Sequence, residues 1–402
     1  MKEEWFKDIA VENDTKLVLL VLDGLGGLPY PEKGRTELEA ARTPNLDALA
    51  RLSECGLLDP VYPGVSPGSG PGHLALFGYD PLRYDIGRGV ISASGVGFEL
   101  VAGDVAARCN FATVDAQGIV TDRAGARIPT EECRRLCEKI SDAIPALDDV
   151  QIFLLPEKSF RACLVLRGKG LSGSVSNTDP LREGHPPLEA RPKNPEGEKT
   201  ARIVSRYLTQ AYELLRDEKP ANSILVRGFD SYRVIPSMND LYQLNPLCLA
   251  LYPAYQGIAR LVGMEVHPTC DSYEQQLEAL ELRWPEYDYF FFHTKDTDER
   301  GEDGDFDAKV AAIEAVDGML PRILDLQPDV LAVTGDHSTP VLLRAHSWHP
   351  VPVLLHSPYC RSGVTSRFDE NACAGGALGR LPAKTLLPQM LAHGLRLKRW
   401  GA

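Results

Sequence analysis

Apolar runs that stop abruptly at polar turns are the main pattern in this chain. Residues 16–22, 287–293 and 330–333 are mostly aliphatic or aromatic, and each passes directly into a polar segment. Apolar runs of this length that end at turn residues are typical of buried strands in a parallel sheet. Residues 248–252 and 351–355 are further strand candidates. The pattern therefore predicts an α/β domain with a doubly wound sheet.

Helical periodicity lies between these runs. Thr43 and Pro44 precede apolar residues at helical spacing, which predicts a capped helix that continues over residues 48–55. A short apolar segment after residue 73 is typical of a helix start. Further helices are predicted over residues 255–262, 272–281 and 306–324.

The middle of the chain has a different pattern. Short alternating runs separated by turns predict strands, and two longer segments predict helices. This combination indicates a smaller α+β domain inserted into the first one. The predicted strands are residues 107–113, 151–155, 162–167 and 223–227, and the helices are residues 129–144 and 198–217. We expect residues 1–90 and 235–402 to form the first domain and residues 91–234 to form the insert.

Composition narrows the function classes. A net charge of −13 over 402 residues argues against nucleic acid or an anionic membrane as the main partner. No apolar run approaches the roughly 18 residues of a membrane-spanning helix. The nine cysteines contain no CxxC pair, which fits reduced thiols better than a disulfide framework or a zinc ribbon. We expect a cytoplasmic protein; the sequence leaves its oligomeric state open.

Candidate metal ligands follow two of the predicted strands. Asp23 comes directly after residues 16–22, and Asp336 and His337 come just after residues 330–333. In open α/β sheets, ligands bind beyond the carboxyl ends of the strands. A carboxylate beside an imidazole can bind a divalent cation. The alternatives are an Asp-Gly turn and an Asp that caps a helix next to a surface His.

An acidic segment follows a third predicted strand. Residues 296–305 contain six carboxylates, among them Asp298 and Glu302, and His346 follows later in the chain. A solvated acidic loop is one interpretation and a cation site is the other. Mixed oxygen and nitrogen ligands suit Mn, Zn, Co or Mg.

Ser69 lies in a loop rich in Gly and Pro, residues 61–73, ahead of a predicted helix. Such a loop exposes backbone N–H groups, and a helix N-terminus favours phosphate. Ser69 is therefore a candidate nucleophile, and a flexible solvent loop is the alternative.

Taken together, these segments resemble the alkaline phosphatase superfamily and, within it, the cofactor-independent phosphoglycerate mutases of the archaeal type. The resemblance covers nearly the whole chain. The matching segments are LVLLVLDGLGG, RTPNLDALA, PGSGPGHLALFGYDP with GRG, ARCNFATVD, TDRAGARI, LSGSVSNTDPL, HTKDTD with GDFDAKV, VTGDHSTP and HSWHPVPVLL.

The resemblance implies an alkaline-phosphatase-like sheet, two divalent metal ions and a phosphoserine intermediate at Ser69. It implies interconversion of 3-phosphoglycerate and 2-phosphoglycerate, with a small phosphorylated substrate as the partner. The implied ligands are Asp23, Ser69, Asp336 and His337 for one metal, and Asp298, Glu302 and His346 for the other. The implied substrate-binding residues of the insert are Arg88, Arg108, Asn110, Asp122, Arg123 and Arg127.

Four positions depart from the family pattern. Glu302 stands where relatives have His, and Gln276 stands where a Lys is expected. Gly70 and His349 stand where acidic residues are expected. These departures leave two alternatives open: a related phosphatase or phosphotransferase, such as a homoserine-kinase-like enzyme, and a non-catalytic metal-binding paralogue.

Overall fold

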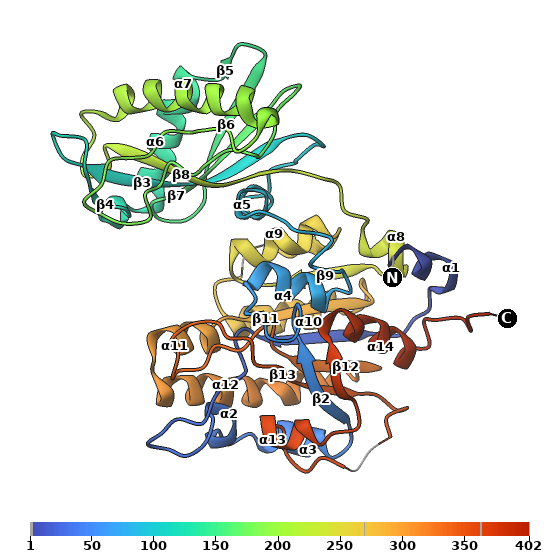
Figure 1. Ribbon diagram of the computed structural model, residues 1–402. Helices are drawn as coiled ribbons and strands as arrows, with labels where there is room; N and C mark the ends of the chain where they lie inside the picture. Colours follow the sequence, from blue (N-terminus) through green and yellow to red (C-terminus); the bar gives the residue numbers. More distant parts are fainter. Residues whose placement is uncertain (1–2, 269, 362–363, 402) are drawn as a thin grey trace. The chain divides into compact units, whose positions relative to one another are not determined.

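The computed structural model describes residues 3–268, 270–361 and 364–401. The chain folds into two compact units, each with its own sheet (Figure 1). Unit 1 comprises the chain up to Asp85, Pro236–Tyr252 and the chain from Val262 onward. Unit 2 comprises Ile86–Ile235 and Pro253–Leu261.

Unit 1 is built on an eight-stranded sheet with the order β10-β9-β11-β1-β12-β13-β2-β14. Its strands are β1 (Leu17–Leu22), β2 (Glu54–Asp59), β9 (Pro246–Leu249), β10 (Glu265–Val266), β11 (Tyr289–Thr294), β12 (Val330–Thr334), β13 (Val351–His356) and β14 (Gly379–Pro382). The central strand β1 pairs in parallel with β11 and β12, whereas β13 runs antiparallel to β12 and β2. The carboxyl ends of β11, β1 and β12 therefore lie at one edge.

Helices cover both faces of this sheet. Phe290 and Phe292 of β11 belong to a buried cluster that also contains Ile313 of α12. Phe291 points to the opposite face, where its ring packs edge-on against Phe77 of α4 with centroids 4.8 Å apart. The predicted doubly wound architecture is thus confirmed. The helices are α1 (Phe6–Ile9), α2 (Glu37–Ala40), α3 (Pro44–Ala50), α4 (Ser69–Leu76), α8 (Met238–Tyr242), α10 (Tyr273–Arg283), α11 (Asp296–Asp303), α12 (Phe306–Asp325), α13 (Glu370–Ala374) and α14 (Leu386–His393).

Unit 2 is an α+β fold around an antiparallel sheet. The sheet has the order β4-β3-β7-β6-β5, and β8 also pairs with β3. Its strands are β3 (Val105–Val114), β4 (Val120–Asp122), β5 (Ala146–Leu147), β6 (Val150–Pro156), β7 (Arg161–Arg167) and β8 (Ser223–Ser231), and its helices are α5 (Arg88–Gly95), α6 (Thr130–Ala143), α7 (Glu198–Leu215) and α9 (Pro253–Leu261).

The two faces of the unit 2 sheet differ. Cys109 and Phe111 of β3 share a buried cluster with α6 and α7. Ala106, on the opposite face, packs with Val90 of α5 and Leu261 of α9. The second face also carries polar side chains, among them Arg108 and Asn110 of β3, which alternate with the inward-facing Cys109 and Phe111. Within the described parts of the chain, no helix is both long and apolar enough to cross a bilayer.

The structure corrects three local predictions. The helix predicted to start after residue 73 begins earlier, because α4 starts at Ser69. The predicted helix over residues 48–55 is wrong at its end, because α3 stops at Ala50 and β2 begins at Glu54. Pairing of β2 with β13 outweighs local helix propensity there. The acidic segment predicted as a loop forms helix α11, with three acidic residues in its first turn. Negative charge at a helix N-terminus is favoured by the helix dipole.

The central position of β1 generates a stability prediction. Leu20 is fully buried, so Leu20→Ala should lower the free energy of unfolding by about 2–5 kcal/mol. Leu82 is 68% exposed, and Leu82→Ala should change it by no more than about 0.5 kcal/mol. Urea unfolding followed by circular dichroism measures both. Equal effects would contradict the assignment of β1 to the core.

Candidate active site

Three strand ends bring the acidic candidates together at one edge of the unit 1 sheet. Asp23 directly follows β1, Asp336 lies two residues after β12, and Asp298 lies in the first turn of α11 after β11. Each of these residues is at most 1% exposed. Residues far apart in sequence therefore converge because their strands are parallel neighbours.

The first group of candidates consists of Asp23, Asp336, His337 and Ser69. His337 Nε2 lies 3.4 Å from Asp23 Oδ1 and 3.2 Å from Asp336 Oδ2. The same nitrogen lies 3.3 Å from the Ser69 hydroxyl oxygen. Ser69 is half-buried at the first position of α4, so its hydroxyl is accessible from solvent. The helix approaches closely because Gly72 has no Cβ; an added Cβ there would lie 2.4 Å from the Asp336 carbonyl oxygen.

Hydrogen bonds determine which nitrogen of His337 carries a proton. The Thr339 hydroxyl donates to Asp298 Oδ1 at 2.6 Å, so its oxygen accepts from His337 Nδ1 at 3.0 Å. With Nδ1 protonated, the neutral imidazole presents the lone pair of Nε2 to Asp23, Asp336 and Ser69. This arrangement orients an imidazole as a metal ligand through a second hydrogen bond.

The second group contains Asp298 and His346, with His337 stacked beside them. His346 Nε2 lies 3.5 Å from Asp298 Oδ1, and the two imidazole rings are 3.6 Å apart. His346 Nδ1 donates to the carbonyl of Pro67 at 2.9 Å, which leaves the Nε2 lone pair facing Asp298. Glu302 lies at the edge of this group, with Oε1 3.6 Å from His346 Nε2 and its side chain 55% exposed. All seven predicted metal ligands thus lie in these two adjoining groups.

The donor set of the first group fits a divalent cation. Asp336 Oδ2 is buried and has no hydrogen-bond partner among the described residues. It faces His337 Nε2, which also lacks a proton, at 3.2 Å. Two lone-pair atoms at this distance repel each other unless positive charge lies beside them, and a divalent cation or His73, whose Nδ1 is 3.2 Å from the same oxygen, can supply it. Among the described residues, three ligand triads have ligand atoms within 4.8 Å of one another: Asp23–Asp336–His337, Asp298–His337–His346 and Asp23–His73–His293.

Two buried imidazoles were not among the sequence-based candidates. His293, in β11, contacts Asp23 Oδ2 through Nε2 at 2.9 Å. His73, four residues after Ser69 on α4, contacts the Ser69 carbonyl through Nδ1 at 2.8 Å. Burial lowers the pKa of His293. For His73, burial acts in the same direction, but the charges of Asp336 and Asp23 outweigh it and raise the pKa. The helical spacing of Ser69 and His73 was the sequence signal for the second of these.

Lys295 lies outside the predicted ligand set, although the sequence suggests it as a cation that could neutralise the nearby carboxylates. Its ammonium contacts the carboxylates of Asp23, at 3.3 Å, and Asp298. Burial opposes a charge on Lys295, but the two carboxylates raise its pKa above the usual range. Burial would raise the pKa of Asp23, but His293 and Lys295 hold it well below the usual value. The site therefore favours the ionised form of Asp23 and places the Lys295 ammonium between Asp23 and Asp298.

The predicted substrate-binding residues lie in unit 2, where several share the polar face of the sheet. Arg108 is directly opposite Arg227 of β8, and Asn110 is directly opposite Arg161 of β7. Directly paired residues point to the same face. Asn110 also donates to the carbonyl of Arg123 at 3.4 Å. Arg227 and Arg161 were not among the predicted substrate-binding residues, because only pairing of distant strands places them beside Arg108 and Asn110.

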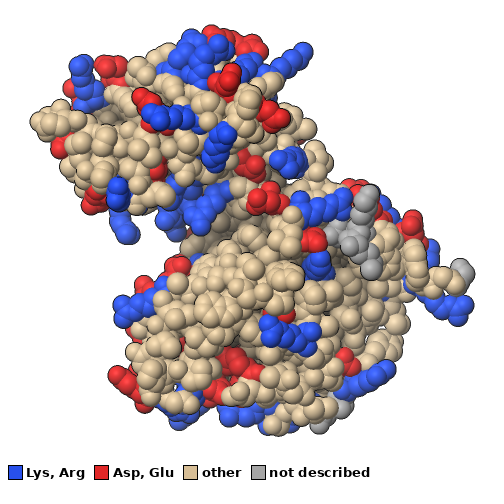
Figure 2. All heavy atoms as spheres, in the orientation of Figure 1, with Lys and Arg blue, Asp and Glu red and all other residues tan. Residues whose placement is uncertain are grey.

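This face has more positive charge than its carboxylates neutralise. Arg123 forms a bidentate pair with Asp179 at 2.9 and 2.7 Å, whereas Arg227 Nε is 3.7 Å from the same carboxylate. Nε of Arg108 and of Arg227 and Oδ1 of Asn110 are buried without a hydrogen-bond partner among the described residues, although Arg108 Nε lies 3.8 Å from Glu157 Oε2. Burial and the charge of Arg108 lower the pKa of Arg227. Figure 2 shows charges of both signs dispersed over the visible surface. An anion is therefore favoured by this local cluster of arginines and not by the net charge of the protein.

The remaining predicted residues of unit 2 have different surroundings. Asp122 accepts hydrogen bonds from the backbone of Ala124 at 2.7 Å and Ala126 at 2.6 Å, so its carboxylate shapes the turn that carries Arg123. Arg127 follows in a left-handed conformation with φ of 53°. Arg88 begins α5 next to β8, since an added Cβ on Gly228 would lie 3.3 Å from its Cβ.

Two departures from the family pattern have structural roles. Gln276 is fully buried, and its amide donates to the carbonyls of Leu249 at 2.7 Å and His293 at 3.3 Å. It therefore ties β9 to β11. The ring of His349 contacts the Ser347 hydroxyl at 3.0 Å and belongs to neither metal-ligand group.

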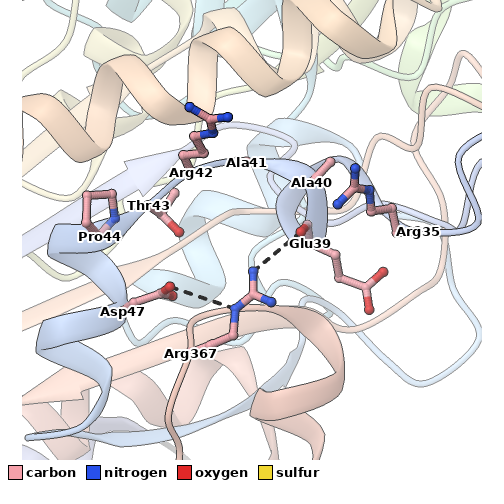
Figure 3. Close-up of a pocket in the computed structure, with 9 residues that line it drawn as sticks. All are labelled: Arg35, Glu39, Ala40, Ala41, Arg42, Thr43, Pro44, Asp47 and Arg367. Atoms are coloured by element: carbon pink, nitrogen blue, oxygen red, sulfur yellow. Dashed lines mark hydrogen bonds and ion pairs between the residues drawn. The ribbon is translucent and has the colours of Figure 1, made fainter.

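A pocket of about 550 Å³ in unit 1 is lined by none of the seven metal-ligand candidates (Figure 3). Arg367 lies at its centre, with Nε 3.8 Å from an Asp47 oxygen and one terminal nitrogen 3.4 Å from the Glu39 carbonyl. These contacts connect α2, α3 and the segment before α13. The pocket is therefore explained by the packing of these elements.

Known proteins match the chain over nearly its full length. The family model described as 2,3-bisphosphoglycerate-independent phosphoglycerate mutase matches residues 50–222. Proteins named probable 2,3-bisphosphoglycerate-independent phosphoglycerate mutase are 51% identical in Thermus thermophilus, covering 98% of both chains, and 48% identical in Aquifex aeolicus, covering 98% of this chain and 99% of the relative.

Solved structures agree with these matches. A Pyrococcus horikoshii protein is 31% identical with a TM-score of 0.82, covering 96% of this chain and 99% of its own. The cofactor-independent phosphoglycerate mutase of Thermoplasma acidophilum is 29% identical with a TM-score of 0.73, covering 95% of this chain and 100% of its own. The resemblance found in the sequence is confirmed, and the chain belongs to the family of 2,3-bisphosphoglycerate-independent phosphoglycerate mutases.

Proposed function

We propose that this protein is a metal-dependent phosphomutase that interconverts 3-phosphoglycerate and 2-phosphoglycerate through a phosphoserine at Ser69. The observation that carries the proposal is the Ser69 hydroxyl, 3.3 Å from Nε2 of His337, the ring nitrogen that also faces the buried carboxylates of Asp23 and Asp336. Family membership supports the same reaction. The nine cysteines are all free thiols, which supports a reducing, cytoplasmic location.

Two divalent ions, Mn, Mg, Co or Zn, fit the two ligand groups. Asp23, Ser69, Asp336 and His337 would hold one ion, and Asp298, His346 and Glu302 would hold the other. Such ions supply positive charge that lowers the pKa of a bound hydroxyl and neutralises a phosphoryl group. His337 and His346 already present lone pairs towards these positions, because each is hydrogen-bonded through its other nitrogen.

In the proposed reaction, Ser69 Oγ attacks the phosphorus of 3-phosphoglycerate. The bond from phosphorus to Oγ forms as the bond from phosphorus to O3 breaks, and the proton lost by Ser69 is taken up by the released glycerate oxygen. Lys295 provides a fixed positive charge near the reacting groups. The glycerate reorients, and its O2 accepts the phosphoryl group from Ser69.

The arginine face of unit 2 is proposed to hold the glycerate. Its guanidinium groups suit the planar carboxylate and the phosphate oxygens of the substrate. Nε of Arg108 and of Arg227 is buried, has a carboxylate only at 3.8 and 3.7 Å and forms no hydrogen bond with the described residues, which supports a bound anion here. We therefore add Arg227 and Arg161 to the predicted set of Arg88, Arg108, Asn110, Asp122, Arg123 and Arg127.

The nucleophile is tested with Ser69→Ala. Turnover of 3-phosphoglycerate, followed by phosphorus NMR, should fall by at least about a thousandfold, because no other group takes over the phosphoryl transfer. Ser66→Ala, three residues earlier in the same exposed loop, is the matched control and should be unaffected. Unchanged turnover in Ser69→Ala would refute the phosphoserine. Release of inorganic phosphate by the parent protein would identify a phosphatase.

The identity of the second metal depends on Glu302. Glu302→His should shift the ion giving maximal activity from Mn or Mg towards Zn or Co, since imidazole is a softer ligand than carboxylate. Metal titrations of activity measure this shift. Asp303→Ala, one residue further on and 60% exposed, serves as the control. If Glu302→Ala binds metal and turns over like the parent, Glu302 is not a ligand.

The substrate face is tested with Arg227→Ala. Loss of a charged hydrogen-bond donor should raise KM for 3-phosphoglycerate about ten- to a hundredfold, with a smaller change in kcat. Arg227→Lys should give an intermediate KM, because charge is retained without the planar fork. Arg216→Ala removes a guanidinium that is 69% exposed and should leave KM unchanged. An unchanged KM in Arg227→Ala would exclude this face as the glycerate site.

A further inference from the structure

Lys309 is a fully buried lysine directly behind the two metal-ligand groups. It lies in the first turn of α12 and has no exposed surface. Its ammonium donates to the carbonyls of Gly24 at 2.9 Å, Thr339 at 2.8 Å and Gly26 at 3.2 Å. An ammonium has three donors, so all of them are used on backbone oxygens. Burying a charge is unfavourable unless it is compensated in this way.

The three carbonyls belong to the two loops that carry the first metal-ligand group. Gly24 directly follows Asp23, and Thr339 lies two residues after His337. The loops also contact each other, since Thr339 N donates to the Gly24 carbonyl at 3.2 Å and Gly24 N donates to Asp336 Oδ1 at 3.2 Å. Lys309 therefore clamps the loop of Asp23 to the loop of Asp336 and His337.

Thr339 extends this clamp to the second group. Its carbonyl accepts from Lys309, while its hydroxyl contacts both Asp298 and His337. An added Cβ on Gly301 of α11 would lie 2.3 Å from the same Thr339 carbonyl oxygen, so α11 packs directly against it. Displacement of this carbonyl would move the residue that sets the tautomer of His337.

The buried carboxylate of Glu37 and the half-buried carboxylate of Glu370 hold the next residues of the same loops. Glu370 accepts from Gly27 N at 2.9 Å, and Glu37 accepts from Val341 N at 2.7 Å. Their charges partly oppose the effect of burial, which lowers the pKa of Lys309. The ammonium thus has carbonyl oxygens on one side and compensating negative charge nearby.

We propose that Lys309 is a positioning residue for both metal groups, and that it holds the two ligand-bearing loops in their metal-binding arrangement. The proposal rests on the metal-binding part of the proposed function. An apolar side chain would fill the same space, but it would leave three converging carbonyl oxygens without a cation. Removing the ammonium therefore disturbs the ligand geometry, and metal affinity depends on Lys309 beyond its contribution to packing.

The test compares metal affinity with stability in two variants of the same helix. Lys309→Met keeps the length of the side chain and removes the charge, and Ile313→Ala shortens a buried side chain one turn later on α12. Mn²⁺ binding to the purified full-length chain is measured by calorimetry, and the melting temperature is measured without metal. Lys309→Met should weaken Mn²⁺ binding about 10- to 100-fold, the range for residues that orient metal ligands. Ile313→Ala should lower the melting temperature but bind Mn²⁺ with the same affinity as the parent.

Chemical rescue by a small cation distinguishes a positioning role of the Lys309 ammonium from a packing role of its side chain. Lys309→Ala, purified with and without methylammonium, should regain Mn²⁺ affinity when the small cation fills the space of the lost ammonium. If Lys309→Met does not fold, Lys309→Ala and Lys309→Gln replace it in the test. The Gln side chain keeps two hydrogen-bond donors. The inference would be overturned if Lys309→Met folds without metal and binds Mn²⁺ with the affinity of the parent. It would also be overturned if methylammonium restores no Mn²⁺ affinity to Lys309→Ala. Absence of Mn²⁺ binding by the parent chain would instead remove the proposed metal sites, and the inference with them.

Discussion

Mutual repulsion of buried carboxylates is the constraint on which the rest of the site depends. Asp23, Asp298 and Asp336 are almost fully enclosed at one sheet edge. Ionised groups in such an environment require compensation by opposite charge and hydrogen bonds. Lys295 compensates Asp23 and Asp298 directly, and Thr339 donates to Asp298. Asp336 Oδ2 lies 3.2 Å from His73 Nδ1, and the charge of Asp336 raises the pKa of His73, so this imidazole contributes to compensating the third carboxylate.

The same constraint explains the orientation of the histidines that face the carboxylates. His337 and His346 are each hydrogen-bonded through Nδ1, and their Nε2 atoms face the acidic groups. Protonation of these nitrogens would satisfy the carboxylates without metal, but burial lowers the pKa of His337 and opposes it. Hydrogen bonds from outside the ligand set thus keep the imidazoles available as ligands.

Much of the sheet and its edge could be predicted, because short-range patterns determine them. The runs that form β1 and β12 are continuous and apolar, and Asp23 and Asp336 follow them closely in sequence. The contributions of His293, Arg227 and Lys309 could not be derived in this way. Each depends on which strands or loops become neighbours, and a single sequence does not report those pairings. The misplaced end of α3 has the same origin, since β2 exists only by pairing with β13 and β14.

The chain passes between the two units four times, because Pro253–Leu261 returns to unit 2 after the strand β9 of unit 1. Leu261 of that excursion packs with Val90 of α5 and Ala106 of β3. Unit 2 is thus not a single cassette inserted into a host domain. A recombination event that exchanged residues 86–235 alone would not transfer Leu261, which is part of this apolar cluster. The two units are therefore expected to be inherited together and to diverge as a pair.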